Sequence, residues 1–465
     1  MTPVSLQVVL QLFKLYSISG ELHPSWKHFI VLPFPKAHKP SHLPSSSYRP
    51  ISLTSHVCKL MEKVVGQRLK LYLEYHSLLH LKQSGFRARR RTTDHILRLH
   101  DAVQKAFANK HNVLAVFIHI EKAYDMVNKT VLVSKLLKLS INGEKCGVSF
   151  SRSFLDDFGS SFPGVKVSAN GHPQRSILSP ILFSIMINDI SCHVFSPSAL
   201  YADDLLFWER SGDIKLLEER CQESLSKVAA WCISSGFLIS PPKSAAVLLE
   251  TWKRKPLSVR LALTHVLIPL KKEYKYLGVT FQSNGMYTAN IQHVVDKCHK
   301  RLNMMRFLKG TSWGASKSPL LTIYRCLVRS VWEYDMEAYF FSARSHMVPL
   351  VKLPNEALQL CTGAMRSTPA LCLQHACNEM PLKLKHHLLC SKYRAHLLTF
   401  PSHPAKTITE DCWQELFPDF DNFCFSNLLT KPTITGHLLR VNVLRVLDAP
   451  PWLLYRPKLD FSVFR

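Results

Sequence analysis

The chain has 465 residues, and 46% of them are hydrophobic, which is typical of a globular protein and excludes a mainly disordered one. Its 59 lysines and arginines outnumber its 33 aspartates and glutamates, so the formal net charge is +26. A charge this large predicts a polyanionic partner, most often nucleic acid. The alternative is a solvated basic surface that keeps the protein in solution.

The 13 cysteines are scattered, and no Cys-x-x-Cys pair occurs among them. They lack the paired spacing of a structural zinc site, so we interpret them as reduced thiols of an intracellular protein. No apolar run reaches the roughly 18 residues that a membrane-spanning helix needs, and the N-terminus has no signal-peptide pattern. We therefore expect no contact with a membrane, and a location in the nucleus or the cytoplasm.

The first part of the chain predicts a loop and two helices. Residues 36–48 are rich in proline and serine and predict the loop. Apolar residues recur at helical spacing between Leu60 and Leu73. Thr92, Thr93 and Asp94 can cap a second helix. The apolar face of that helix comprises Ile96, Leu99, Val103 and Phe107.

The middle of the chain alternates between strand and helix patterns. The continuous apolar run 113–118 predicts a strand that is buried on both faces. The later elements in chain order are a helix at 131–139, a helix from Pro180, a hairpin at 201–204, a helix at 214–231 that stops near Gly236, and strands at 237–239, 247–249 and 274–281. The chain turns mostly helical from Ile291, and residues 401–465 show no clear period. This order predicts an α+β or α/β domain followed by an all-α region.

The segment Tyr201-Ala202-Asp203-Asp204 places two adjacent carboxylates between apolar stretches. Strands are depleted in aspartate, and a buried carboxylate without a partner is strongly disfavoured. Such a pair usually needs a compensating cation, and Mg²⁺ prefers carboxylate oxygens. The tetrapeptide alone could also be a solvated turn.

Further segments around this pair form an ordered series. They are Tyr48-Arg49-Pro50-Ile51-Ser52-Leu53, Gly85-Phe86-Arg87 through Asp94, the strand end that leads into Lys122-Ala123-Tyr124-Asp125, Gly171-His172-Pro173-Gln174-Arg175-Ser176, Pro242-Lys243-Ser244, and Tyr276-Leu277-Gly278. In this order the blocks resemble the reverse transcriptases of non-LTR (LINE-like) retrotransposons. The resemblance covers about residues 18–400.

The resemblance implies a right-hand polymerase of class α+β, with fingers, a palm built on an antiparallel sheet, and a helical thumb. We expect fingers at 1–100, palm at 101–285, thumb and connection at 286–400, and a poorly defined tail at 401–465. Family members usually carry an endonuclease domain upstream, so we expect a truncated copy that begins inside the fingers.

The resemblance also implies the site and its partners, which are an RNA template, a DNA primer and deoxynucleoside triphosphates. Two Mg²⁺ ions, with Mn²⁺ as a possible substitute, would be held in part by Asp203 and Asp204. The implied nucleotide contacts are Lys36, Lys39, Arg49, Tyr124 as a steric gate against ribose, Gln174, and Lys243 near the phosphates. Tyr276, Leu277 and Gly278 would form the primer grip. The alternatives are solvated charge for the basic residues, core packing for Tyr124 and a turn for Gln174.

Two positions depart from the family pattern. His119 stands where the family has its first metal-binding aspartate, and imidazole offers a nitrogen donor without negative charge. Arg175 stands where the family has a glycine, so a side chain enters a space where backbone approaches nucleic acid. A nitrogen ligand favours Mn²⁺ or Zn²⁺ over Mg²⁺.

We therefore expect an RNA-directed DNA polymerase fold whose catalytic function is impaired in this copy. The rival hypotheses are a non-catalytic RNA- or DNA-binding remnant of the element and a relic without a selected role. A metal-dependent nuclease is disfavoured, because no cluster of histidine and carboxylate residues at metal spacing supports it.

Overall fold

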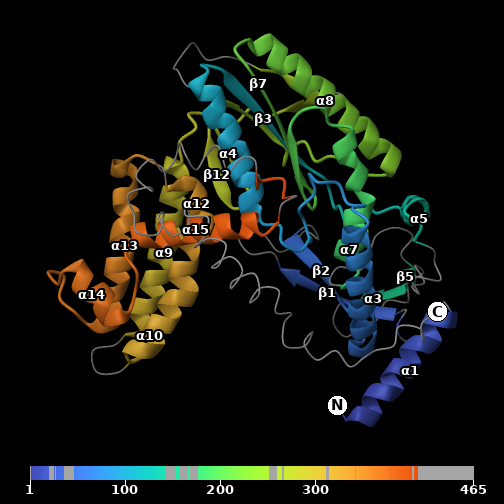
Figure 1. The fold of residues 1–465 in the computed structure, drawn as a ribbon, viewed down its shortest axis with the longest axis horizontal. Helices are drawn as coiled ribbons and strands as arrows, with labels where there is room; N and C mark the ends of the chain where they lie inside the picture. Colours follow the sequence, from blue (N-terminus) through green and yellow to red (C-terminus); the bar gives the residue numbers. More distant parts are fainter. Residues whose placement is uncertain are drawn as a thin grey trace, which may run out of the picture. The chain divides into compact units, whose positions relative to one another are not determined.

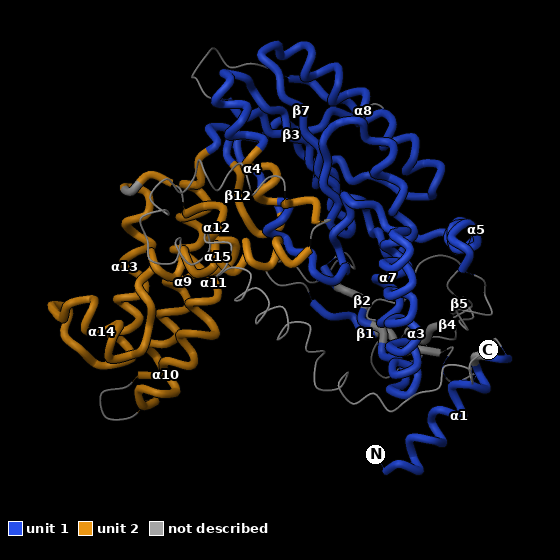
Figure 2. The backbone as a smooth tube through the Cα atoms, viewed as in Figure 1, with its two compact units in different colours: residues 1–95, 102–276, 282–285 blue, residues 96–101, 277–281, 286–465 orange. Residues whose placement is uncertain are grey.

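The computed structural model describes residues 2–19, 23, 26, 28–35, 47–141, 153–156, 166–167, 176–250, 259–263, 266–309, 314–340, 342–400 and 403–406. The chain divides into two compact units, which Figure 2 distinguishes by colour. The first comprises residues 1–95, 102–276 and 282–285, and the second comprises 96–101, 277–281 and 286–465.

The main sheet of the first unit has four strands in the order β6-β7-β3-β8, and every neighbouring pair is antiparallel. The strands are β6 (Ser198–Tyr201), β7 (Asp204–Ser211), β3 (Asn112–His119) and β8 (Ala245–Leu249). Strand β3 lies in the interior of the sheet, and six of its eight residues are buried. Its continuous apolar run follows from this position, because both faces of the strand are covered.

Different partners cover the two faces of β3. Leu114, Val116 and Ile118 join the large apolar core that also includes buried residues of α7 and α8. Helix α8 (Ile214–Ser235) packs on β3 and β7 (Figure 1), and α7 (Ser179–Met186) packs against α5 (Lys129–Lys138) and α3 (His56–Tyr75). Phe117 points to the opposite face, because side chains alternate along a strand, and its ring stacks on Tyr274 with centroids 4.5 Å apart.

The described residues form three further sheets. A second four-stranded sheet has the order β2-β1-β4-β5, with β1 at His28–Pro35, β2 at Tyr48–Leu53, β4 at Ser153–Asp156 and β5 at Lys166–Val167. Two-stranded sheets are formed by β9 (Leu261–Leu263) with β10 (Val266–Ile268), and by β11 (Glu273–Tyr276) with β12 (Val279–Gln282). The remaining elements are α1 (Pro3–Ser19), α4 (Thr92–Ala108) and the short 3-10 helix η2 (Asn188–Cys192).

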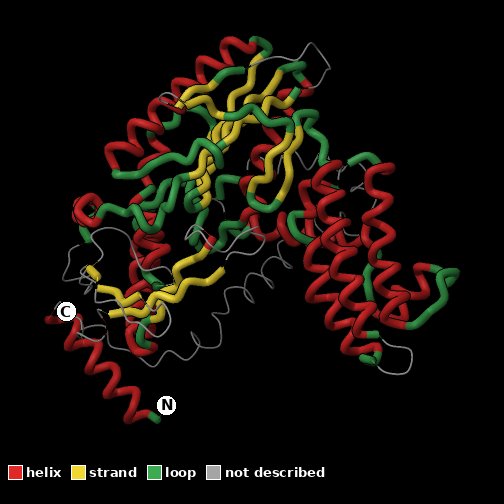
Figure 3. Tube along the Cα trace, turned by 180° about the vertical axis from the view of Figure 1, so that it is seen from behind, coloured by secondary structure: helices red, strands yellow, loops and turns green. Residues whose placement is uncertain are grey.

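The described part of the second unit is almost entirely helical, as the colouring of Figure 3 shows. Its helices are α9 (Thr288–Leu308), α10 (Lys317–Ile323), the π-helix η3 (Tyr324–Arg329), α11 (Ser330–Trp332), α12 (Met336–Tyr339), α13 (Arg344–Thr362), α14 (Ala370–Cys377) and α15 (Leu382–Leu398). Helix α13 packs against α9, α10 and α14. Glu379, whose side chain is 6% exposed, pairs with Arg325 at 2.7 Å and Arg329 at 3.0 Å.

The structure confirms the predicted class, α+β with an antiparallel sheet and a helical region after it. Two local predictions were wrong. Residues 237–239 form no strand, because only Ile239 makes an isolated bridge, to Ile120. Residues 274–281 form two strands instead of one, because Leu277 and Gly278 adopt positive φ angles of 45° and 94° and turn the chain. In the part of the chain that the structure describes, no helix has the length and apolar character to span a bilayer.

Candidate active site at the end of β3

The two carboxylates lie in the tight turn that joins β6 to β7. Tyr201 pairs with Asp204 across the hairpin, so Ala202 and Asp203 are the two turn residues. Ala202 has a φ of +54°, which two-residue hairpin turns require at their first position. The turn therefore presents Asp203 and Asp204 side by side at the edge of a buried sheet.

The segment 82–85 is hydrogen-bonded to β6 next to this turn. The Ser84 amide donates to Leu200 O at 2.9 Å, and the Leu200 amide donates to Lys82 O at 3.0 Å. These bonds bring Gly85 against Ala202, so close that a Cβ built on Gly85 would lie 2.4 Å from the Ala202 nitrogen. Only glycine leaves room for this approach of two backbones.

His119 contacts both carboxylates. It pairs with Asp204 in the register of β3 and β7, and its Nδ1 lies 3.2 Å from Asp204 Oδ1. The same nitrogen lies 3.9 Å from Asp203 Oδ2. One donor atom from each of the three side chains falls within 4.8 Å of the others, so the expectation that no histidine and carboxylate residues cluster at metal spacing was wrong. The structure thus brings His119 next to both carboxylates, and its role as a metal ligand stays a prediction.

The turn that carries Lys243 is tied to the backbone of His119. The His119 amide donates to Ser244 Oγ at 3.2 Å, and the Ser240 amide donates to His119 O at 2.9 Å. Ser244 Oγ also donates to Ser240 O at 2.9 Å, and Tyr274 Oη donates to Lys243 O at 2.9 Å. These bonds hold Lys243 near Asp203, whose carboxylate its charge stabilises.

The electrostatics of the turn favour a cation. Burial raises the pKa of the Asp203 carboxyl above its ordinary value, and the charge of Asp204 raises it further. A backbone hydrogen bond, His119 and Lys243 act in the opposite direction without cancelling the effect. Since two neighbouring carboxylates that lose hydration repel each other, a bound cation would relieve this repulsion.

Tyr124 lies beside the carboxylates with its ring held by two phenylalanines. The ring stacks on Phe183 at 4.7 Å and meets Phe86 edge-on at 6.5 Å. Burial raises the pKa of the Tyr124 hydroxyl, and the charge of Asp203 adds to the shift. The hydroxyl therefore stays protonated at neutral pH and can act as a hydrogen-bond donor.

The three residues of the predicted primer grip are described in the unit to which each belongs. Tyr276 belongs to the first unit, where its ring packs on Phe117 with centroids 5.3 Å apart. Leu277 and Gly278 belong to the second unit, where Tyr334 Oη donates to Leu277 O at 2.8 Å. Tyr334 also closes the space above Gly278.

Several predicted residues cannot be placed at the site. Lys36, Lys39, Gln174 and Arg175 lie outside the described residues. Arg49 lies in β2 opposite Phe34, and only its backbone is described. Their roles remain predictions.

Three supporting residues were not recognised in the sequence analysis as part of the site. Gly85 lies in one of the segments of the family pattern but far in sequence from the Asp-Asp hairpin, so no sequence signal indicated its contact with Ala202. Ser244 directly follows Lys243, one of the predicted site residues. Because serine side chains after a turn often form hydrogen bonds with nearby backbone groups, its position could have indicated a supporting role. Phe183 gave no signal beyond the apolar pattern of its helix.

The antiparallel sheet thus carries two adjacent carboxylates on a hairpin and a histidine at the end of the neighbouring strand. Residues 35–281 match the family described as reverse transcriptase (RNA-dependent DNA polymerase), and this is more than half of the chain. The chain therefore belongs to the reverse transcriptase family.

Two of the curated relatives are polymerases from mobile elements of Drosophila melanogaster. The probable RNA-directed DNA polymerase from transposon BS is 28% identical over 72% of this chain and 38% of its own length. The RNA-directed DNA polymerase from mobile element jockey is 26% identical over 77% of this chain and 40% of its own length. Among solved structures, apo telomerase from Candida tropicalis is similar with a TM-score of 0.41 and 10% identity, over 90% of this chain and 74% of that chain. The chain thus spans about two fifths of the length of these curated relatives.

Reverse transcriptases typically use divalent metal ions. The question is whether the ligand atoms of His119, Asp203 and Asp204 suit such ions. Mg²⁺ takes oxygen ligands in a near-ideal octahedron, and a pair of such ions needs several bridging carboxylates. Here the cluster offers two carboxylates and one imidazole nitrogen. These residues do not fit a pair of Mg²⁺ ions.

Proposed function

We propose that this chain has the architecture of an RNA-directed DNA polymerase of the non-LTR retrotransposon type. The proposed reaction joins a deoxynucleotide to a DNA primer on an RNA template, with attack of the primer 3′-hydroxyl on the α-phosphate and release of pyrophosphate. The observation that carries the proposal is the convergence of His119, Asp203 and Asp204 at the end of β3, within the segment that matches the family. In this proposal residues 1–100 are the fingers, 101–285 the palm and 286–400 the thumb and connection.

The proposed roles of the chain's residues follow from their chemistry. Lys36, Lys39 and Arg49 bind the triphosphate, and an arginine suits this because its guanidinium can contact two phosphate oxygens at once. Tyr124 excludes a ribose 2′-hydroxyl through its ring, which Phe183 holds in place. Gln174 lies beside the nucleotide, and Lys243 donates a proton to the leaving pyrophosphate.

We further propose that catalysis with Mg²⁺ is impaired in this copy. His119 supplies no negative charge where the family has an aspartate, and its Nδ1 lies 3.2 Å from Asp204 Oδ1 and 3.9 Å from Asp203 Oδ2. Arg175 adds a second obstacle, because a side chain replaces the glycine of the family pattern at that position.

Primer extension on an RNA template with Mg²⁺ tests these proposals. We expect wild type to give no extension above background, and the double variant His119→Asp, Arg175→Gly to extend the primer. Adding Asp203→Asn to the double variant is the matched control and should abolish extension. Extension by wild type at the rate of the double variant would remove the impairment hypothesis. If the double variant folds like wild type and still fails to extend, the polymerase assignment loses its support.

The second candidate function is nucleic-acid binding without chemistry, which the net charge of +26 favours. Contacts to the phosphate backbone release counterions, so log affinity falls linearly with log salt concentration. We expect an RNA–DNA hybrid to bind wild type and Asp203→Asn equally, with a steep salt dependence. Weak, salt-independent binding would exclude this function.

A further inference from the structure

We infer that His119, Asp203 and Asp204 bind one divalent cation of the first transition series in preference to Mg²⁺. The inference rests on the proposed function for the location of the site, and it names the kind of ion that this altered site takes. It starts from the disagreement between the donor set and the all-oxygen ligands that Mg²⁺ requires.

The geometry of the three side chains suits a single ion. Donors that lie ~2.1 Å from an ion at tetrahedral or octahedral angles are about 3.0–3.4 Å apart. His119 Nδ1 lies 3.2 Å from Asp204 Oδ1, which is already such a distance. The separation of 3.9 Å from Asp203 Oδ2 needs only a small side-chain rotation to reach it.

The chemistry of the donors selects the class of ion. Imidazole nitrogen binds transition-metal dications well, whereas Mg²⁺ keeps oxygen ligands and retains its waters. Carboxylates bind both classes, so Asp203 and Asp204 do not discriminate between them. His119 therefore determines the preference.

The site is both fixed and open to solvent. Backbone bonds to Ser244 and Ser240 hold His119 in place, and the β3–β7 register fixes it opposite Asp204. The His119, Asp203 and Asp204 side chains are 25%, 32% and 42% exposed, so an ion can reach them with part of its water shell. Within the described part of the chain, no other group of three His, Cys, Asp or Glu side chains brings its donor atoms this close together.

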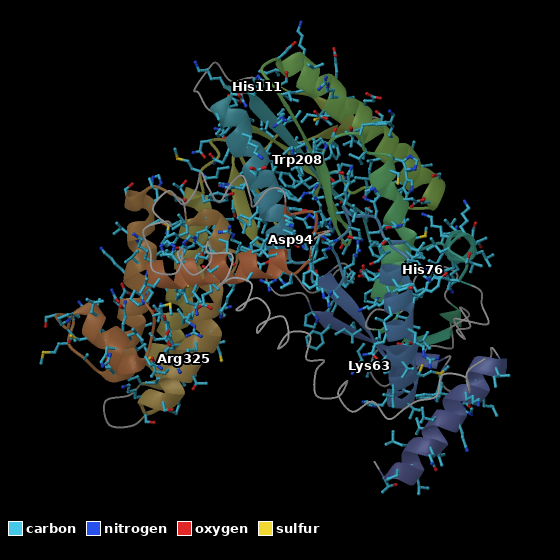
Figure 4. The ribbon with its side chains drawn as sticks, viewed as in Figure 1. Lys63, His76, Asp94, His111, Trp208 and Arg325 are labelled. Carbon is cyan, nitrogen blue, oxygen red and sulfur yellow. The ribbon has the colours of Figure 1, made fainter. Side chains whose placement is uncertain are left out.

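A Mn²⁺ titration tests the inference without any need for polymerase activity. Binding is measured as the decrease of the EPR signal of free Mn²⁺. Mn²⁺ is the chosen probe because it has less affinity than Zn²⁺ for the chain's thiols. Competition with Mg²⁺ in the same samples gives the ratio of the two affinities. The variants are His119→Asp, His119→Ala and Asp203→Asn. His111→Ala is the matched control, because His111 is an exposed histidine that precedes the other end of β3 (Figure 4).

We expect wild type and His111→Ala to bind one Mn²⁺ per chain with a clear preference over Mg²⁺. His119→Ala and Asp203→Asn should lower Mn²⁺ affinity at least about tenfold, and His119→Asp should lower the Mn²⁺-to-Mg²⁺ ratio by a similar factor. Equal Mn²⁺ affinity in wild type and His119→Ala would overturn the inference, as would a wild-type preference for Mg²⁺ or the absence of a stoichiometric site. Circular dichroism melting of each variant separates loss of the site from loss of the fold.

These outcomes are independent of the primer-extension result. Mn²⁺ binding that depends on His119 supports the metal inference even if the double variant never extends a primer. Extension by the double variant with Mg²⁺, together with no Mn²⁺ site in wild type, supports the polymerase assignment and refutes the metal inference.

Discussion

Gly85→Ala tests whether the segment behind the Asp-Asp turn holds the turn in place. The added Cβ would lie 2.4 Å from the nitrogen and 3.0 Å from the Cα of Ala202. Both are backbone atoms, so no flexible side chain can move aside. Restoring an ordinary contact of about 3.5 Å would push the two segments apart by about 1 Å.

The magnitude follows from the contacts that this displacement disturbs. Overpacking of this kind costs about 1–3 kcal/mol. The hydrogen bonds from Ser84 to Leu200 and from Leu200 to Lys82 would stretch, at about 1 kcal/mol each. Alanine also restricts the unfolded chain more than glycine does, which stabilises the folded state by about 0.4–1 kcal/mol. This gain applies here because Gly85 does not have a positive φ angle. We expect a net loss of about 2–4 kcal/mol in local stability.

Hydrogen exchange of the Ser84 and Leu200 amides measures this loss directly, and Mn²⁺ binding reports on the turn. Both amides should exchange faster in Gly85→Ala, and Mn²⁺ affinity should fall. The control is Gly212→Ala, whose Cβ would meet its nearest neighbour, His111, at an ordinary 3.6 Å. That variant should be neutral or slightly stabilised. If Gly85→Ala exchanges and binds Mn²⁺ like the control, the supporting role of the segment is refuted.

Three further predictions concern Asp203, Ser244 and Gly278. Asp203→Asn should raise the free energy of unfolding at neutral pH, because burial and a neighbouring charge raise the pKa of this carboxyl in the folded state. Because the pKa is raised, wild type loses stability as pH rises from the unfolded-state pKa through the folded-state pKa. The difference in unfolding free energy between the variant and wild type, measured in urea melts, should therefore grow with pH. A difference that stays constant with pH would contradict this prediction. Ser244→Ala removes a buried hydroxyl that forms hydrogen bonds with two backbone groups. The variant should therefore lose about 1–3 kcal/mol of unfolding free energy, measured by urea unfolding. An unchanged urea midpoint would show that the hydroxyl is dispensable. Gly278→Ala and Gly363→Ala both place a Cβ on a residue with positive φ, but of the two only the Cβ at Gly278 meets a ring, that of Tyr334 at 2.7 Å. Thermal melting should therefore show a larger loss of stability for Gly278→Ala than for Gly363→Ala. Equal losses would mean that the Tyr334 ring moves aside freely.

The sequence by itself determined the local elements and the family. The apolar run of β3, the helical period of α8 with its left-handed Gly236 cap, and the Asp-Asp hairpin were all predicted and are all present. These features depend on neighbouring residues, on side-chain periodicity and on the φ angles that glycine allows, so a short window of sequence contains them. Ordered blocks along the chain were sufficient to indicate a reverse transcriptase, which the family match supports.

Only the tertiary structure decided which side chains His119 contacts. The sequence shows a histidine in place of an aspartate, but contact between His119 and Asp204, 85 residues apart, depends on the register of β3 with β7. The close approach of Gly85 to Ala202 and the bonds from Ser244 to His119 likewise join distant segments. Such contacts leave no period in the sequence, because they are set by strand pairing and core packing across the whole unit. The residue types in the sequence therefore predicted the site and the kind of metal it would prefer, while the distances between the donor atoms came from the fold.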